Sequence, residues 1–175
     1  MASTLHDISV LSYRQMLGAA AHFLALGQTH CETHGIDPRT LVETRLIADM
    51  LPFQFQVQSI LHHSMGAVEA LRSGRFGPPH GLPEHDYADL VAQVAEAHAT
   101  MQGIEPEAIN NLAGRDVVFS ARETERHFTA EGFVLSFSLP NLHFHAATAY
   151  DILRMMGVPV GKRDFVGQLR LKTTD

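Results

Sequence analysis

The stretch SLPNLHFHAATAYDILRMMG, residues 138–157, has the apolar spacing of a long amphipathic helix. Its apolar side, extended by one turn upstream, comprises Leu135, Leu139, Leu142, Ala149 and Leu153. Pro140 lacks the N–H that its turn requires, so the helix should bend there, and Gly157 should end it. The stretch therefore predicts the last long helix of the chain, over residues 131–156.

Three more stretches of this 175-residue chain have helical spacing, over residues 7–34, 53–73 and 87–101. Gly35 is typical of a helix end, and Asp37 followed by Pro38 is typical of a new start. These signals predict a short helix over residues 37–51. Asp86 is placed to cap the third long helix.

Two connections between the long helices are distinctive. Residues 74–86, GRFGPPHGLPEHD, are rich in glycine and proline and indicate a long crossover loop. Residues 116–120 and 126–129 alternate around a polar turn and predict a small β-hairpin before the last helix. Four long helices connected in this way predict an all-α four-helix bundle, folded as a single domain over residues 1–175.

Composition excludes several classes of protein. The net charge is −6 and the longest basic run is Lys162-Arg163, so we expect no nucleic-acid partner. The single cysteine, Cys31, excludes an internal disulfide framework and suits a reducing compartment. No apolar run reaches about 20 residues, and the start does not resemble a signal peptide. We therefore expect a soluble cytoplasmic protein that does not bind membranes.

Histidines are abundant, with 12 in the chain, and two of them fall on inward sides of predicted helices. At 100° per residue, His145 falls on the apolar side of the last helix, whereas His143 points the other way. His63 flanks the apolar stripe of the second long helix, on one line with Gln56. We therefore expect His63, His145, Gln56 and Tyr150 to border a ligand pocket between the helices.

Several stretches of the sequence are familiar: GIDP, RLIADMLPFQFQVQ, HHSMGAVEALRSG and SLPNLHFHAATAYDILRMMGVPVGKRDF. Together they resemble domain-of-unknown-function family 1993, within the DinB/YfiT-like superfamily of four-helix bundles, over about residues 8–167. Wider relatives include metal-dependent thiol transferases and a maleylpyruvate isomerase. In these relatives one histidine of the second helix and two of the fourth, spaced four apart, bind a divalent metal.

The resemblance implies a possible metal site for Zn, Ni or Mn, and it can be checked residue by residue. His63 and His145 match two of the three ligand positions, but the position four residues after His145 is Ala149, which cannot bind a metal. His98, on the apolar side of the third helix, is the alternative third ligand. A lone histidine on an apolar face is more often a core residue with a hydrogen bond. His98 is therefore interpreted either as a metal ligand or as a hydrogen-bonded core residue.

Two further motifs have simpler explanations. HCETH, residues 30–34, has two histidines at metal-chelating spacing, but they are expected to be solvated at a helix end. GKRDF, residues 161–165, lacks the glycines of a phosphate-binding loop. We expect Phe165 to dock on the bundle, with Lys162 and Arg163 solvated or paired to a carboxylate.

Three functions remain open from the sequence. The leading hypothesis is a protein that binds a small molecule in an apolar pocket between helices, with His63 and His145 as its polar features. The second is a divalent-metal thiol transferase or isomerase that uses the same histidines. The third is a homodimeric interaction module without catalysis. The identity of the ligand is not encoded in any motif.

Overall fold

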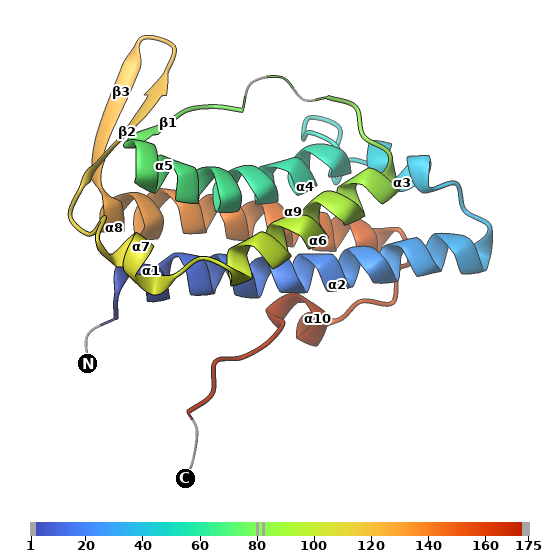
Figure 1. Ribbon diagram of the computed structural model, residues 1–175. Helices are drawn as coiled ribbons and strands as arrows, with labels where there is room; N and C mark the ends of the chain where they lie inside the picture. The colour runs from blue at the N-terminus through green and yellow to red at the C-terminus, as the bar shows by residue number, and fades with distance from the viewer. Residues whose placement is uncertain (1–2, 80, 82, 173–175) are drawn as a thin grey trace.

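The computed structural model describes residues 3–79, 81 and 83–172, and most of these are helical (Figure 1). Two helices are continuous: α2 (Val10–His34) and α6 (Tyr87–Gln102). Two further runs are interrupted by π-helical turns: α4 (Phe53–Leu61), η1 (His62–Gly66) and α5 (Ala67–Ser73), and then α8 (Ala130–Phe133), η2 (Val134–Ser138) and α9 (Leu139–Met155). These four long segments lie side by side, with α2 against α6 and α4 against α9. The shorter helices are α1 (Leu5–Ile8), α3 (Pro38–Glu43), α7 (Pro106–Asn110) and α10 (Lys162–Val166).

The predicted helix ends are confirmed where they depend on local capping. Gly35 ends α2 with a left-handed φ of 63°. The side chain of Asp37 accepts a hydrogen bond from the N–H of Arg39 at the start of α3. The Asp86 side chain caps α6 in the same way. The short helix predicted over residues 37–51 is too long, because the chain becomes extended at Thr44 and α3 ends at Glu43.

A small three-stranded sheet lies at one end of the helices (Figure 1). The predicted hairpin is confirmed as β2 (Asp116–Ala121) paired antiparallel to β3 (Thr124–Thr129), with Val118 opposite His127. The third strand, β1 (Arg75–Phe76), pairs parallel to β2 and was not expected. It forms where the crossover connection leaves α5. Residues 80 and 82 of this predicted loop lie outside the described residues.

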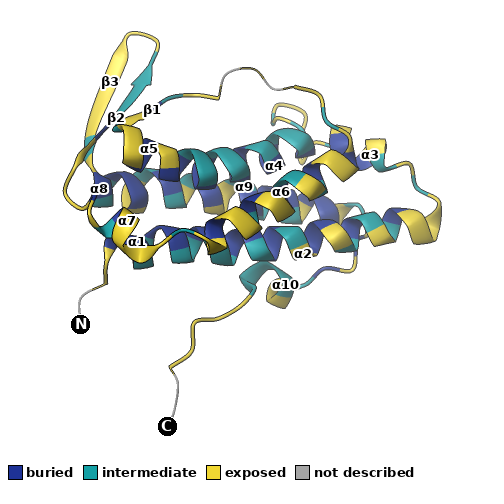
Figure 2. Ribbon diagram, viewed as in Figure 1, coloured by how far each residue is buried: buried dark blue, intermediate teal, exposed yellow. Residues whose placement is uncertain are grey.

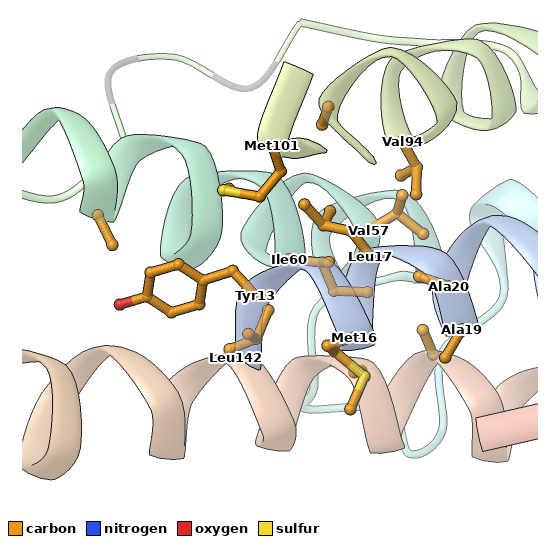
Figure 3. Packing of buried hydrophobic residues seen from close by; sticks show 14 of the residues in the cluster. Tyr13, Met16, Leu17, Ala19, Ala20, Val57, Ile60, Val94, Met101 and Leu142 are labelled. Atoms are coloured by element: carbon orange, nitrogen blue, oxygen red, sulfur yellow. The ribbon is translucent and has the colours of Figure 1, made fainter. Parts of the chain in front are cut away.

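The core lies where the four long segments face one another, and exposed residues cover the outside (Figure 2). Figure 3 shows Leu17 of α2 beside Val57 of α4, with Val94 of α6 close by, all within the buried cluster. None of the helices in the described part of the chain combines the length and apolar character needed to cross a bilayer.

The apolar side predicted for the last helix is confirmed except at Leu135, and Leu139 is partly buried against the core. Leu142 and Leu153 are fully buried, but Leu135 is 54% exposed. The reason is η2, because Leu135 lies within this π-turn and the turn shifts the helical phase of the residues before it relative to those after it.

Candidate functional site

The two π-turns lie against each other, and a buried chain of hydrogen bonds joins them. The Ser138 hydroxyl of η2 donates to the carbonyl oxygen of His63 in η1, at 2.8 Å. Because that donation uses the only hydroxyl proton of Ser138, the Tyr13 hydroxyl of α2 must donate to Ser138 Oγ, also at 2.8 Å. All three residues are buried. π-Turns are often found at functional sites, and here one places His63 between the helices.

His145 reaches the same region from α9. Its Nδ1 lies 2.8 Å from Oε1 of Gln56, a residue of α4 that is 2% exposed. The Gln56 amide nitrogen donates to the carbonyl of Leu51 at 2.8 Å, so the amide orientation is fixed with Oε1 as the acceptor. His145 therefore carries its proton on Nδ1. The lone pair of its Nε2 is left available to accept a hydrogen bond.

The imidazoles of His63 and His145 lie parallel. Their ring centroids are 5.7 Å apart, with 12° between the planes. His63 is 8% exposed, and its Nδ1 is buried without a hydrogen-bond partner among the described residues. A buried polar atom in this state is costly and identifies a position where a further polar group would be favourable.

Burial keeps both rings neutral. Desolvation lowers the pKa of His63 to about 3, and the neighbouring His62 and His145 add to the shift. Desolvation and then His62 lower the pKa of His145 to about 4. At pH 7 each ring therefore offers one N–H donor and one nitrogen acceptor instead of a positive charge.

Four aromatic rings lie beside the two imidazoles. Phe76 and Phe137 lie 5.7 and 5.8 Å from the ring of His63. Phe55 and Phe144 lie 5.7 and 5.2 Å from the ring of His145. We call Gln56, His63 and His145, together with these four phenylalanines, the imidazole site. It combines an apolar wall with a few oriented polar atoms, as small-molecule sites commonly do.

The structure does not bring all of the predicted residues to this site. The Tyr150 ring lies on the other side of α9, against Phe23 of α2 and Phe165 of the C-terminal segment, at 6.4 and 5.6 Å. That contact is the docking expected for Phe165. His98 lies against Gly18 of α2 and borders a separate cavity.

The neighbours of the two histidines along the chain have other surroundings. His143 is exposed, as predicted. His62 is half-buried, because its ring stacks on Phe76 at 4.5 Å and its Nε2 lies 2.9 Å from the carbonyl of Gly77. The roles of Tyr13 and Ser138 are not apparent from helical spacing, although Pro140, two residues after Ser138, indicates a local break in the helix.

The donor set does not fit the three-ligand metal site of the wider superfamily. Ala149 occupies the third ligand position and is fully buried. Among the residues that the structure describes, no group of three histidine, cysteine, aspartate or glutamate side chains could hold a metal ion. His98 does not replace the missing ligand, because it borders a cavity between α2 and the C-terminal segment, away from His63 and His145.

Comparison with known proteins identifies a matching family and a similar solved structure. The family described as Domain of unknown function (DUF1993) matches residues 5–166. The crystal structure of a DinB family member protein from Shewanella denitrificans is similar, with a TM-score of 0.82 and 28% sequence identity over 97% of this chain and 96% of that chain. No curated protein matches this chain.

Proposed function

The chain belongs to the DUF1993 family of DinB-like proteins, and from that premise we propose that it binds a small molecule at the imidazole site, between α4 and α9 of a four-helix bundle. The expected ligand is mostly apolar and carries one group that can donate and accept hydrogen bonds. The observation that supports this proposal is the buried Nδ1 of His63, which has no hydrogen-bond partner among the described residues and lies beside the oriented ring of His145.

The geometry favours hydrogen bonding to a ligand over proton transfer. A general acid or base works best when its pKa lies near the working pH. The pKa values of His63 and His145, about 3 and about 4, are far below neutrality. Neutral imidazoles are good hydrogen-bonding partners at pH 7, and burial among phenylalanines strengthens each such bond.

Gln56 supports the same proposal through its effect on His145. Its Oε1 holds the Nδ1 proton, so the ring presents one defined acceptor instead of two interchangeable nitrogens. Orientation of this kind lowers the entropy lost when a ligand binds. Such orientation is also typical of metal-binding histidines, so a metal-dependent thiol transferase or isomerase is the second candidate. It has less support, because the described residues contain no group of three side chains that could hold a metal ion.

The test is a ligand-observed NMR screen of phenols, amides and carboxylic acids, with wild-type protein and the His63→Ala and His145→Ala variants. Compounds that bind wild-type protein should lose binding by at least about tenfold in both variants, the loss of about 1.4 kcal/mol that one good hydrogen bond supplies. His143→Ala is the matched control, because this exposed histidine lies two residues from His145 on the same helix. The proposal fails if binders are unaffected by both substitutions, or if none is found.

Chelation separates the two candidate functions. Binding to the imidazole site should survive treatment with EDTA, because it uses neutral nitrogens directly. Near one metal ion per chain by elemental analysis, lost in His145→Ala and retained in His143→Ala, would instead support the metal-dependent enzyme.

A further inference from the structure

A cavity lies on the opposite side of α2 from the imidazole site. It has a volume of about 800 Å³ and is bordered by α2, the end of α6 and the C-terminal segment, residues 163–171. Figure 1 shows α10 beneath α2, on the side away from α4. No residue of the imidazole site borders this cavity.

The C-terminal segment is held in place on α2 at several points. The Gln15 side chain donates to the carbonyl of Val166 at 2.9 Å. Gly167 has a φ of +65° and lies so close to α2 that an added Cβ would be 3.1 Å from the Cβ of Ala19. Farther along, Arg170 Nη1 donates to the carbonyl of Asp7 at 2.9 Å. These contacts hold the C-terminal segment against α2, where it forms one wall of the cavity.

The lining is strongly basic, although the chain as a whole has a net charge of −6. Three arginines border the cavity, together with two histidines: Arg14, Arg163, Arg170, His22 and His98. The acidic residue of the lining is Asp164, and both of its oxygens are already engaged. Oδ1 accepts from His22 Nε2 at 2.8 Å, and Oδ2 accepts from the N–H of Gly161 at 2.7 Å. These two donors lower the Asp164 pKa, so this carboxylate stays ionised and hydrogen-bonded to them.

Two of the three arginines have guanidinium groups available to bind an anion. Within the described part of the chain, Arg14 and Arg163 make no hydrogen bond or ion pair, and Arg14 is half-buried. A half-buried guanidinium without an anion loses part of its hydration with no compensation. Its planar fork of donors is suited to two oxygens of a phosphate or carboxylate group.

Gly18 gives this cavity room for one of its histidines. A Cβ on this residue would lie 3.0 Å from Nε2 of His98, so the absence of a side chain allows the imidazole to rest against α2. His98 thus adds a polar ring to the cavity wall, opposite the C-terminal segment. This placement gives a function for a histidine that the imidazole site does not use.

We propose that this cavity is a binding site for a small soluble anion that carries at least two phosphate or carboxylate groups. Arg14 and Arg163 make the main charge-assisted contacts, and Arg170 contributes from the far wall. The site is separate from the imidazole site and does not depend on the function proposed there.

The experiment is calorimetric titration of the full chain with inorganic pyrophosphate and, separately, with citrate, in buffer of near-physiological ionic strength. We expect saturable binding of one probe or both, with one site per chain. Arg14→Gln and Arg163→Gln should each weaken it at least tenfold. Arg72→Gln is the matched control, because this arginine lies on α5 beside Glu69 and away from the cavity, and it should bind like wild type.

The comparison of probes and variants decides the outcome. Preference for pyrophosphate identifies a phosphate ligand, and preference for citrate identifies a carboxylate ligand. The proposal is overturned if neither probe binds saturably, or if Arg72→Gln weakens binding as much as the cavity variants do, which would indicate a general effect of charge. Arg163 is exposed, so its replacement preserves the fold and gives a decisive result even if Arg14→Gln unfolds.

Discussion

Replacing Ser138 with alanine should destabilise the protein more than any loss of volume would explain. The change leaves two buried groups without partners: the Tyr13 hydroxyl, which donates to Ser138 Oγ, and the His63 carbonyl, which accepts from it. Each buried polar group left without a hydrogen-bond partner costs about 1–3 kcal/mol, so we expect a loss of about 2–4 kcal/mol in the free energy of unfolding. For a chain of this size the melting temperature should fall by about 6–12 °C. Tyr13→Phe should cost less, about 1 kcal/mol, because Ser138 still donates to the carbonyl.

Urea unfolding followed by circular dichroism measures these losses directly. Ser136→Ala is the matched control, since this exposed serine lies in the same π-turn and donates to the carbonyl of Gly132. It should change the free energy of unfolding by less than about 0.5 kcal/mol. If Ser138→Ala is no more destabilising than Ser136→Ala, the two π-turns are not held together by this network, and the account of how His63 is positioned is wrong.

Two further predictions follow from burial. The folded pKa values of His63 and His145, about 3 and about 4, lie below the 6.5 of an ordinary histidine, so the unfolded chain takes up protons first as the pH falls. The free energy of unfolding should therefore decrease from about pH 6.5 toward about pH 4, and urea titrations should show a shallower decrease for His145→Ala. Gly27→Ala should cost about 1–3 kcal/mol, because the added Cβ would overlap the hydroxyl of buried Tyr87. Gly103→Ala is the control, because a Cβ added there would lie 3.6 Å from its nearest neighbour, the carbonyl oxygen of Thr100. Its melting temperature should be close to that of the wild-type protein, and an equal loss in both variants would contradict the steric explanation for Gly27.

The parts of the fold that depend on local chemistry could be predicted from the sequence. The ends at Gly35 and the start at Asp86 were correct, because a left-handed glycine and a capping carboxylate act within a few residues. The strand Arg75–Phe76 could not be predicted, because it exists only through pairing with Val118 and Phe119, more than 40 residues away in the sequence. A pair of residues carries no periodicity of its own.

The candidate site was predictable to the same limited extent. Helical phase indicated that His63, Gln56 and His145 face inward, and the structure brings these three together. Helical phase also suggested His98, and Tyr150 was expected to border the pocket, but both residues lie elsewhere. Phase shows which side of a helix is buried but not which neighbour covers it, and α9 is covered by α4 on one side and by α2 on another.

The π-turns explain why a regular helical wheel was misleading for part of this chain and why the imidazole site exists at all. A π-turn adds a residue to one turn, so the residues before and after it no longer share one face. Leu135, which lies within η2, is consequently exposed, while Leu142, after it, is buried. The widened turn also changes the bonding of the backbone carbonyls, and at His63 the hydroxyl of Ser138 from the facing π-turn supplies a hydrogen bond. The irregularity in each run is thus stabilised by the irregularity in the other. A regular helix would satisfy its backbone hydrogen bonds without the hydroxyl of Ser138. The π-turn at His63 is therefore better explained by the position that it gives to the His63 side chain than by a gain in stability.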